Sequence, residues 1–116
     1  MTEQPAASSG PGGPGLSEVV DVPQRGRFEV LLDGEVAGYT LYRDNGGERT
    51  FPHTEVDEGF QGRGLATVLI RAALDATRAA GLTVNPVCPA VRRFISREGA
   101  YLDIVPPARQ AEHGLG

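Results

Sequence analysis

The sequence predicts an α+β fold in which a mixed, mostly antiparallel sheet is flanked by two helices. Short β-type segments dominate the first half of the chain, and two stretches with helical apolar spacing lie in the second half. The resulting order of three strands, helix, strand, helix and strand makes a mixed sheet with helices packed against it the simplest architecture. At 116 residues, 40% of them hydrophobic, the chain has material for one hydrophobic core.

The two ends of the chain differ in composition from its middle. Residues 1–18 begin with a stretch rich in proline and glycine that lacks large apolar side chains after Met1, so we expect a disordered tail. Residues 106–116 begin with two prolines and show no apolar periodicity, which predicts a flexible C-terminal tail. The predicted folded domain therefore comprises residues 19–105.

The first three strands are expected before residue 57. Residues 27–32 and 35–43 are β-type runs on either side of Asp33-Gly34, a dipeptide that suits the positive φ angles of a tight hairpin, so these two strands should pair. A third strand is expected over residues 48–56. It contains Pro52, which lacks a backbone donor and therefore indicates an edge position or a bulge.

Two helices and two short strands are expected after this point. A helix over residues 61–80 ends at Gly81, and a short buried strand follows over residues 82–87. Pro89 suits the first turn of a second helix, which should end at Gly99, before a last short strand at 101–105. The apolar spacing of the first helix depends on Leu65, Leu69, Ala72, Ala73, Ala76 and Ala80. That of the second depends on Val91, Phe94 and Ile95.

The composition also limits the classes of function. A net charge of −4 argues against nucleic-acid binding, which needs a concentrated basic surface. One cysteine and two histidines cannot build an internal disulfide or a structural zinc site, so we expect no metal. No apolar run is long enough to cross a bilayer and no signal-peptide pattern is present, so we expect a cytoplasmic protein without membrane association. We further expect a monomer or a weak dimer.

A glycine-rich turn between the third strand and the first helix is the strongest functional signal. Residues 56–66 contain three glycines, whose flexible backbone can pass close to a ligand, and the start of a helix favours an anion. This pattern predicts a cradle for a phosphate group. The lysine of a P-loop is absent and the glycine spacing is not that of a dinucleotide fingerprint, which argues against ATP and NAD. A plain strand-to-helix turn fits the spacing equally well.

The turn also resembles a family signature. The residues Gln61, Gly62, Arg63, Gly64, Leu65 and Ala66 resemble the Gln/Arg-x-x-Gly-x-Gly/Ala acetyl-CoA motif of the GCN5-related N-acetyltransferases. The run from His53 to Val56, the Cys88-Pro89 pair and Tyr101 are similar to those of minimal single-domain members, which lack the usual N-terminal helices. The resemblance extends over about residues 28–105 and implies a compact fold of that family.

The resemblance implies a function and a donor site. The chain would transfer an acetyl group from acetyl-CoA to an amine of a small molecule or a protein. Alternatively, it would be a non-catalytic CoA-binding or protein-interaction module that retains the fold. Acetyl-CoA would lie between the splayed strands 48–56 and 82–87, next to Val56. Its pyrophosphate would contact the N–H groups of residues 61–66, and Arg63 would add positive charge. Arg92 and Arg93 either contact further phosphates or are solvated surface residues.

The sequence departs from the larger members of the family at the last helix. Those members often carry a tyrosine in a Tyr-x-x-x-Gly pattern, which protonates the departing CoA thiolate. Counting back from Gly99 places Ile95 at the position of that tyrosine, and Cys88 near a position where an asparagine is common. The usual general acid is therefore missing, and Tyr101 lies close in sequence without necessarily reaching the site.

Three residues are candidates for catalysis. Cys88 stands at a helix start, where the helix dipole promotes the thiolate, so it either accepts the acetyl group or serves as a small buried packing residue. His53 and Glu55 are two positions apart on a strand and therefore share one face. If that face lines the donor cleft, either side chain could remove a proton from the incoming amine. Otherwise they form the polar outer face of the strand.

Overall fold

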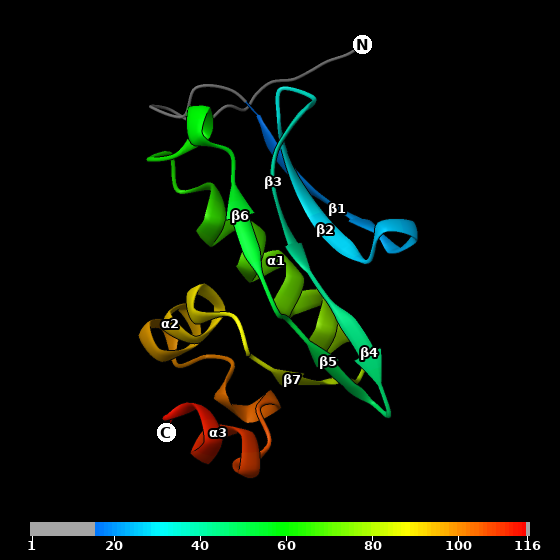
Figure 1. The fold of residues 1–116 in the computed structure, drawn as a ribbon, viewed down its shortest axis with the longest axis vertical. Coiled ribbons are helices and arrows are strands. Elements are labelled where there is room, and N and C mark those ends of the chain that lie inside the picture. Colours follow the sequence, from blue (N-terminus) through cyan, green and yellow to red (C-terminus); the bar gives the residue numbers. More distant parts are fainter. Residues whose placement is uncertain (1–15, 116) are drawn as a thin grey trace.

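The computed structural model describes residues 16–115, which form seven strands and three α-helices (Figure 1). The tail expected over residues 1–18 lies outside the described residues for most of its length. Its last two residues belong to a strand, β1 (Ser17–Val22), which the sequence analysis did not identify. β1 pairs antiparallel with β2 (Arg27–Leu32) along its whole length, so the folded domain begins earlier than expected.

The predicted α+β class with a mixed, mostly antiparallel sheet is confirmed. One group of strands has the order β1-β2-β3-β6, and all of its pairs are antiparallel. The other has the order β4-β5-β7, in which β5 and β7 are parallel. The remaining strands are β3 (Glu35–Leu41), β4 (Arg43–Asn45), β5 (Glu48–Thr50), β6 (Thr54–Val56) and β7 (Thr83–Asn85).

The predicted hairpin between β2 and β3 is confirmed. Asp33 and Gly34 adopt φ angles of 53° and 83°, which are the positive values that a tight two-residue turn requires. The turn is also tied to the edge strand, because the Leu16 N–H donates to Asp33 Oδ1 at 3.1 Å. Farther from the turn, a register shift between Val30 and Leu31 places Phe28 opposite Thr40, and both side chains are buried.

The strand expected over residues 48–56 is divided at Pro52 into β5 and β6. Phe51 is almost completely buried, its N–H donates to Asn85 O at 3.1 Å, and its carbonyl accepts from the Cys88 N–H at 2.8 Å. Before Phe51, β5 pairs with β4 and β7, whereas beyond it β6 pairs with β3 and no longer with the segment after β7. The two neighbouring segments therefore diverge here, as the family resemblance implied.

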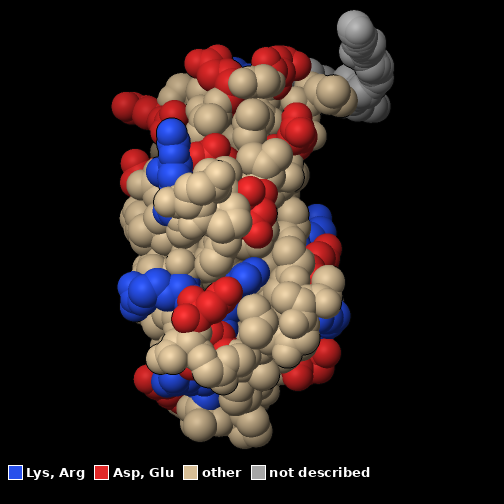
Figure 2. Space-filling model, turned by 90° about the vertical axis from the view of Figure 1, so that its right-hand side faces the viewer, with Lys and Arg blue, Asp and Glu red and all other residues tan. Residues whose placement is uncertain are grey.

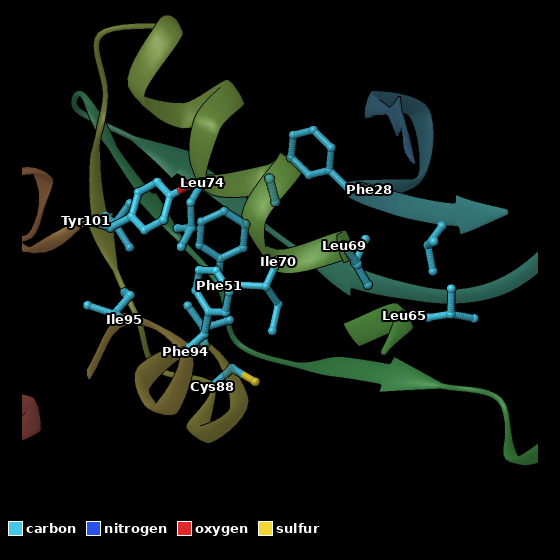
Figure 3. Packing of buried hydrophobic residues seen from close by; sticks show 14 of the residues in the cluster. Phe28, Phe51, Leu65, Leu69, Ile70, Leu74, Cys88, Phe94, Ile95 and Tyr101 are labelled. Atoms are coloured by element: carbon cyan, nitrogen blue, oxygen red, sulfur yellow. The ribbon is translucent and has the colours of Figure 1, made fainter. Parts of the chain in front are cut away.

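The two predicted helices are present. α1 (Leu65–Ala79) begins four residues later than expected, because Gly62 and Gly64 hold the preceding turn in left-handed conformations with φ angles of 83° and 73°. α2 (Pro89–Glu98) begins at the predicted proline and ends at Gly99. Figure 3 shows Phe51 near both helices, with the side chains of Ile70 and Phe94 beside it.

The C-terminal segment differs from the prediction in two ways. The expected strand at 101–105 is a 3₁₀ turn (Leu102–Ile104), and the expected flexible tail forms a third helix, α3 (Pro107–His113). Arg109 donates from two of its nitrogens to the carboxylate of Glu48 at 2.8 and 2.9 Å, which ties α3 to β5. Because polar contacts with a distant residue attach α3, its sequence shows no apolar periodicity from which a helix could be predicted. Figure 1 shows α2 and α3 together at the end of the molecule where β7 lies.

Candidate functional site

A pocket of about 280 Å³ lies at the junction of β6, the glycine-rich turn and the starts of α1 and α2. Six of the residues that the sequence assigned to acetyl-CoA line it: Val56, Gln61, Gly62, Gly64, Leu65 and Ala66. Four further residues complete its wall and were not singled out as binding residues from the sequence: Thr54, Phe60, Thr67 and Ala90. Thr54 directly follows the candidate His53, and Ala90 lies two residues after the candidate Cys88. No pattern in the sequence indicated that these side chains face the pocket.

The glycine-rich turn is held by local hydrogen bonds. Gln61 Nε2 donates to Val56 O at 3.1 Å, which closes the loop between the end of β6 and the start of α1. The Phe60 N–H donates to Asp57 O at 2.8 Å in a short 3₁₀ turn. Gly64 then occupies the N-cap of α1 in a left-handed conformation that other residues rarely adopt.

The start of α1 presents unpaired donors to the pocket. Gly64 supplies no side-chain cap, and the first N–H of the helix with a backbone partner is that of Val68, which donates to Gly64 O at 3.3 Å. The N–H groups of Leu65, Ala66 and Thr67 have no intrahelical acceptor, and the helix dipole makes this end positive. A phosphate oxygen fits these donors. Apolar walls from Val56 and Ala90 continue the pocket toward the start of α2.

The three predicted arginines lie outside the pocket wall. Arg63 is exposed, and its guanidinium lies 6.0 Å from the centre of the Phe60 ring, so it stands beside a pocket residue. Arg92 Nη1 donates to Val87 O at 2.7 Å, which holds its guanidinium on the backbone before α2. Arg93 is exposed. Of the three, Arg63 is therefore the best placed to add positive charge near the glycine-rich turn.

Cys88 occupies the N-cap of α2, as its position before Pro89 predicted, but its side chain is buried. The residue is 3% exposed and is absent from the pocket wall. Its thiol does not cap the helix and instead donates to Thr54 Oγ1 at 3.4 Å. Figure 3 shows the side chain at the start of α2, with its sulfur directed away from Phe94. Within the described residues, the hydrogen bond to Thr54 links the Cys88 side chain to the pocket wall.

His53 and Glu55 project together from the strand face opposite to Thr54 and Val56. Both side chains are about half exposed, and His53 Nε2 lies 3.1 Å from Glu55 Oε1. The Tyr39 hydroxyl donates to the same carboxylate oxygen at 3.3 Å. Hydrogen bonds from His53 and then Tyr39 hold the pKa of Glu55 below its usual range. His53 and Glu55 thus form one exposed cluster outside the pocket wall.

The tyrosines do not replace the missing general acid in the pocket. None of the three tyrosines, all of which lie within the described chain, lines it. Tyr101 instead donates to Asp75 Oδ1 of α1 at 2.6 Å and packs against Phe94. Ile95, at the position where larger family members carry the tyrosine, is completely buried. Tyr101 therefore supports the packing of α1 against the turn after α2.

Two further features concern the described residues as a whole. Residues 16–115 contain no group of three His, Cys, Asp or Glu side chains arranged to hold a metal ion. Among the described helices, none combines the length and the apolar character needed to cross a membrane.

The arrangement of a divided strand, a glycine-rich turn and a helix start agrees with the acyltransferase fold that the sequence resemblance implied. A family model described as GCN5-related N-acetyl-transferase matches residues 27–104, and the chain therefore belongs to this family. Its sequence is 32% identical over 114 residues to that of Protein NATD1 from Bos taurus, and the alignment covers 92% of this chain and 100% of the relative. A GCN5-like putative N-acetyltransferase from Staphylococcus aureus shares the fold, with a TM-score of 0.60 and 21% identity over 77% of this chain and 87% of the other.

Proposed function

We propose that the protein transfers the acetyl group of acetyl-CoA to an amine on a small molecule or on a protein. The observation that carries this proposal is the pocket at the start of α1, where unpaired N–H groups and two left-handed glycines meet apolar walls. Such a site suits a ligand with an anionic end and an uncharged extension. Acetyl-CoA combines a pyrophosphate with a pantetheine arm and supplies the thioester carbon that an amine attacks.

In the proposed complex, the chain contributes binding and orientation. The N–H groups of residues 65–67 hold the pyrophosphate, and Arg63 adds positive charge at the rim. Val56 and Ala90 contact the uncharged arm and exclude water from it. These interactions place the reacting carbon toward the divergence of β6 from the segment after β7. The reaction then forms a bond from the amine nitrogen to the acetyl carbon and breaks the bond from that carbon to sulfur.

His53 and Glu55, the candidate proton acceptors from the sequence, project from the strand face opposite to the pocket residues Thr54 and Val56. Their contact at 3.1 Å joins two half-exposed side chains outside the pocket wall. The proposed reaction is therefore a direct attack of the amine on the thioester, with no step through either residue. The burial of Cys88 favours this direct route over an acetyl-cysteine intermediate, because a 3% exposed thiol has little room for an added acetyl group.

The test of the proposed reaction is the release of CoA from acetyl-CoA in the presence of a panel of amines and peptides. A reaction without acceptor measures the background hydrolysis. Mass spectrometry of the protein after incubation with acetyl-CoA alone distinguishes the routes, since direct attack leaves the mass unchanged. An adduct of one acetyl group that disappears in Cys88→Ala would overturn the direct route in favour of the thiol.

The test of the binding site is Gly64→Glu, which adds bulk and negative charge where the pyrophosphate is expected. We expect this variant to lose CoA binding, measured by calorimetry. Gly34→Glu is the matched control, because Gly34 also has a positive φ and an added Cβ there meets no atom within 4 Å. Unchanged CoA affinity in a folded Gly64→Glu protein would contradict the assignment of the pocket.

The second candidate function is a CoA-binding module without catalytic activity. The observation that favours it is the absence, among the pocket residues, of a tyrosine or an exposed thiol to protonate the CoA thiolate. Stoichiometric CoA binding without release of CoA from acetyl-CoA, across the whole acceptor panel, would support this alternative.

A further inference from the structure

We propose that the open edge of β1 (Ser17–Val22) binds an extended, basic segment of a partner protein, which adds to the sheet as a further strand. β1 is the terminal strand of the order β1-β2-β3-β6, so its outer side has no strand partner within residues 16–115. The inference goes beyond the proposed acetyl transfer. It also names an acceptor class for that reaction, a lysine-bearing polypeptide, and this part alone rests on the proposed function.

The length and regularity of β1 distinguish it from the other strands at sheet edges. Among the described strands, the other edges are β4, β6 and β7, and each of these has three residues. β1 has six residues and pairs with β2 at every one of them without a register shift. Proteins protect their edges with short strands, proline, lysine or bulges, and β1 has none of these. It is therefore the edge best suited to accept another strand.

The charge of the edge indicates what kind of strand it accepts. Glu18 and Asp21 are both exposed, and because they are three positions apart they project from opposite faces of the sheet. The nearby Arg25 and Arg27 lie 3.6 and 2.7 Å from the carboxylate of Glu29, which occupies both of them. Among the described residues, neither Glu18 nor Asp21 forms an ion pair. Basic side chains on an added strand would therefore find an acidic partner on each face.

The remaining side chains of β1 give the edge a partly apolar character. Val19 packs against the core, and on the same face Asp21 accepts a hydrogen bond from the Tyr42 hydroxyl at 2.7 Å. Val20 and Val22 lie on the other face and are half-buried. An added strand would cover the exposed part of these valines, which favours its binding. Backbone hydrogen bonds and apolar contacts then give affinity, and the two carboxylates select for basic side chains.

The same charges argue against two other occupants of the edge. A second copy of the chain would add its own β1, which brings two further carboxylates and no basic side chain into the ladder. Residues 1–15 contain three prolines, one glutamate and no basic residue, so their sequence is unsuited to a strand and cannot complement the edge. Charge complementarity therefore favours a basic segment from a different protein.

The experiment uses the full chain without acetyl-CoA and a synthetic peptide, Thr-Lys-Val-Thr-Lys-Val-Thr-Val. Its lysines are three positions apart, which matches the spacing of Glu18 and Asp21. Fluorescence anisotropy of the labelled peptide measures the affinity, and NMR hydrogen exchange measures the protection of single amides. We expect the outward-facing amides of β1 to exchange quickly in the free protein and to become protected when the peptide binds. The amides of β4, another edge, should not change.

Two comparisons separate strand addition from general charge attraction. A peptide with proline in place of each valine has the same charge but cannot pair as a strand, so it should give no protection. Glu18→Lys should weaken binding of the original peptide about tenfold. Glu35→Lys is the matched control, because it makes the same charge reversal at an exposed residue of β3, two strands from the edge. It should change the affinity by less than about twofold.

Four results would overturn the proposal. They are an absence of β1 protection at millimolar peptide, equal binding of the proline peptide, equal losses in the two lysine variants, and β1 amides that are already protected in the free protein. In the last case, protection that rises with protein concentration would assign the edge to a second copy, and constant protection would assign it to residues 1–15. Failure of acetyl transfer would leave the proposed docking intact, because no acetyl-CoA is present in these measurements.

Discussion

At the scale of single residues, Gly38 determines how closely β6 approaches β3. A Cβ added at this position would lie 2.6 Å from Glu55 O and 3.0 Å from Val56 Cα, so no side chain fits without moving the β6 backbone. Gly38 is also the register partner of Val56, which lines the pocket. A residue outside the pocket therefore controls the position of the strand that forms its wall.

We predict that Gly38→Ala lowers both the free energy of unfolding and the affinity for CoA. The added methyl group pushes against backbone atoms that cannot rotate away, and overpacking of this kind costs about 1–3 kcal/mol. Urea unfolding and calorimetry with CoA measure the two effects. Gly59→Ala is the control, since it has an ordinary φ and no atom within 4 Å of its added Cβ. An unaltered CoA affinity in Gly38→Ala would show that the pocket tolerates displacement of β6.

A second prediction at this scale concerns Tyr101. Burial and the hydrogen bond to Asp75 raise the pKa of Tyr101 to about 12, from an ordinary value of 10.0. A group whose pKa is raised by folding stabilises the protein below its unfolded pKa, and this contribution is lost as the pH rises through the folded value. We therefore expect Tyr101→Phe to be less stable by about 1 kcal/mol at neutral pH, with a difference that shrinks between pH 10 and 12.

Denaturant unfolding of the parent and of Tyr101→Phe over this pH range measures the difference. CoA binding should be the same in both proteins, because Tyr101 is not part of the pocket wall. A constant difference up to pH 12 would show that the hydroxyl contributes nothing through its ionisation.

At the scale of elements, the fastening of α3 to β5 is the feature with the clearest pH dependence. Hydrogen bonds from Arg109 hold the pKa of Glu48 below its usual value of 4.5. A carboxylate with a lowered pKa stabilises the folded state above its unfolded pKa, and this contribution is lost as the pH falls through the folded value. The attachment of α3 should therefore weaken below about pH 5.

We predict that Glu48→Gln reduces the stability at neutral pH and flattens its decline in acid. Thermal unfolding from pH 7 to acid measures both effects. Glu112→Gln is the matched control, because Glu112 also accepts from Arg109 at 2.8 Å but lies within α3 and does not attach it to the sheet. Its smaller effect would assign the stabilisation to the contact between elements. Equal effects of the two variants would contradict that assignment.

Elements defined by local residues could be predicted from the sequence, and those defined by distant partners could not. The hairpin at Asp33-Gly34 and the limits of α2 follow from proline and glycine at the required positions, and both are confirmed. The prediction of α3 as a flexible tail was wrong because its main contact joins Arg109 to Glu48, 61 positions earlier. The strand expected at 101–105 was wrong as well, since Tyr101 turns toward α1 instead of extending the sheet.

The candidate site shows the same division. The glycine-rich turn was recognised because its residues are contiguous, and six of them, counting Val56, line one pocket. The pairing of β6 with β3 determines that Thr54 points toward the pocket and that His53 and Glu55 point away from it. Strand alternation predicts which residues share a face, but it does not tell which face meets the helix.

At the scale of the whole molecule, the fold is an elongated body of 45 × 28 × 24 Å with mixed surface charge. On the face shown in Figure 2, basic and acidic side chains are interspersed, and acidic ones gather toward the upper end. An anionic ligand would therefore be attracted by the N–H groups at the start of α1 and by Arg63 beside them, and not by a basic surface extending over this face.

We predict that deletion of residues 1–15 leaves the melting temperature and the CoA affinity unchanged. This segment has no large apolar side chain after Met1 and no basic residue, so its sequence offers neither core contacts nor charge for a phosphate. Differential scanning calorimetry and CoA titration of the shortened protein measure both quantities. A substantial fall in either would mean that the segment contributes to the domain.

The parallel pairing of β5 with β7 has a consequence for synthesis on the ribosome. Chains emerge from the N-terminal end, so β1 to β6 are available to pair while β7 is still inside the exit tunnel. During this interval one side of β5 is an unpaired edge, the kind of edge that recruits strands from other molecules. The edge is covered when residues 83–85 arrive, and Arg109 fastens the same strand only later. Slow elongation through the codons for residues 57–85 would prolong this exposed state and should lower the yield of folded protein.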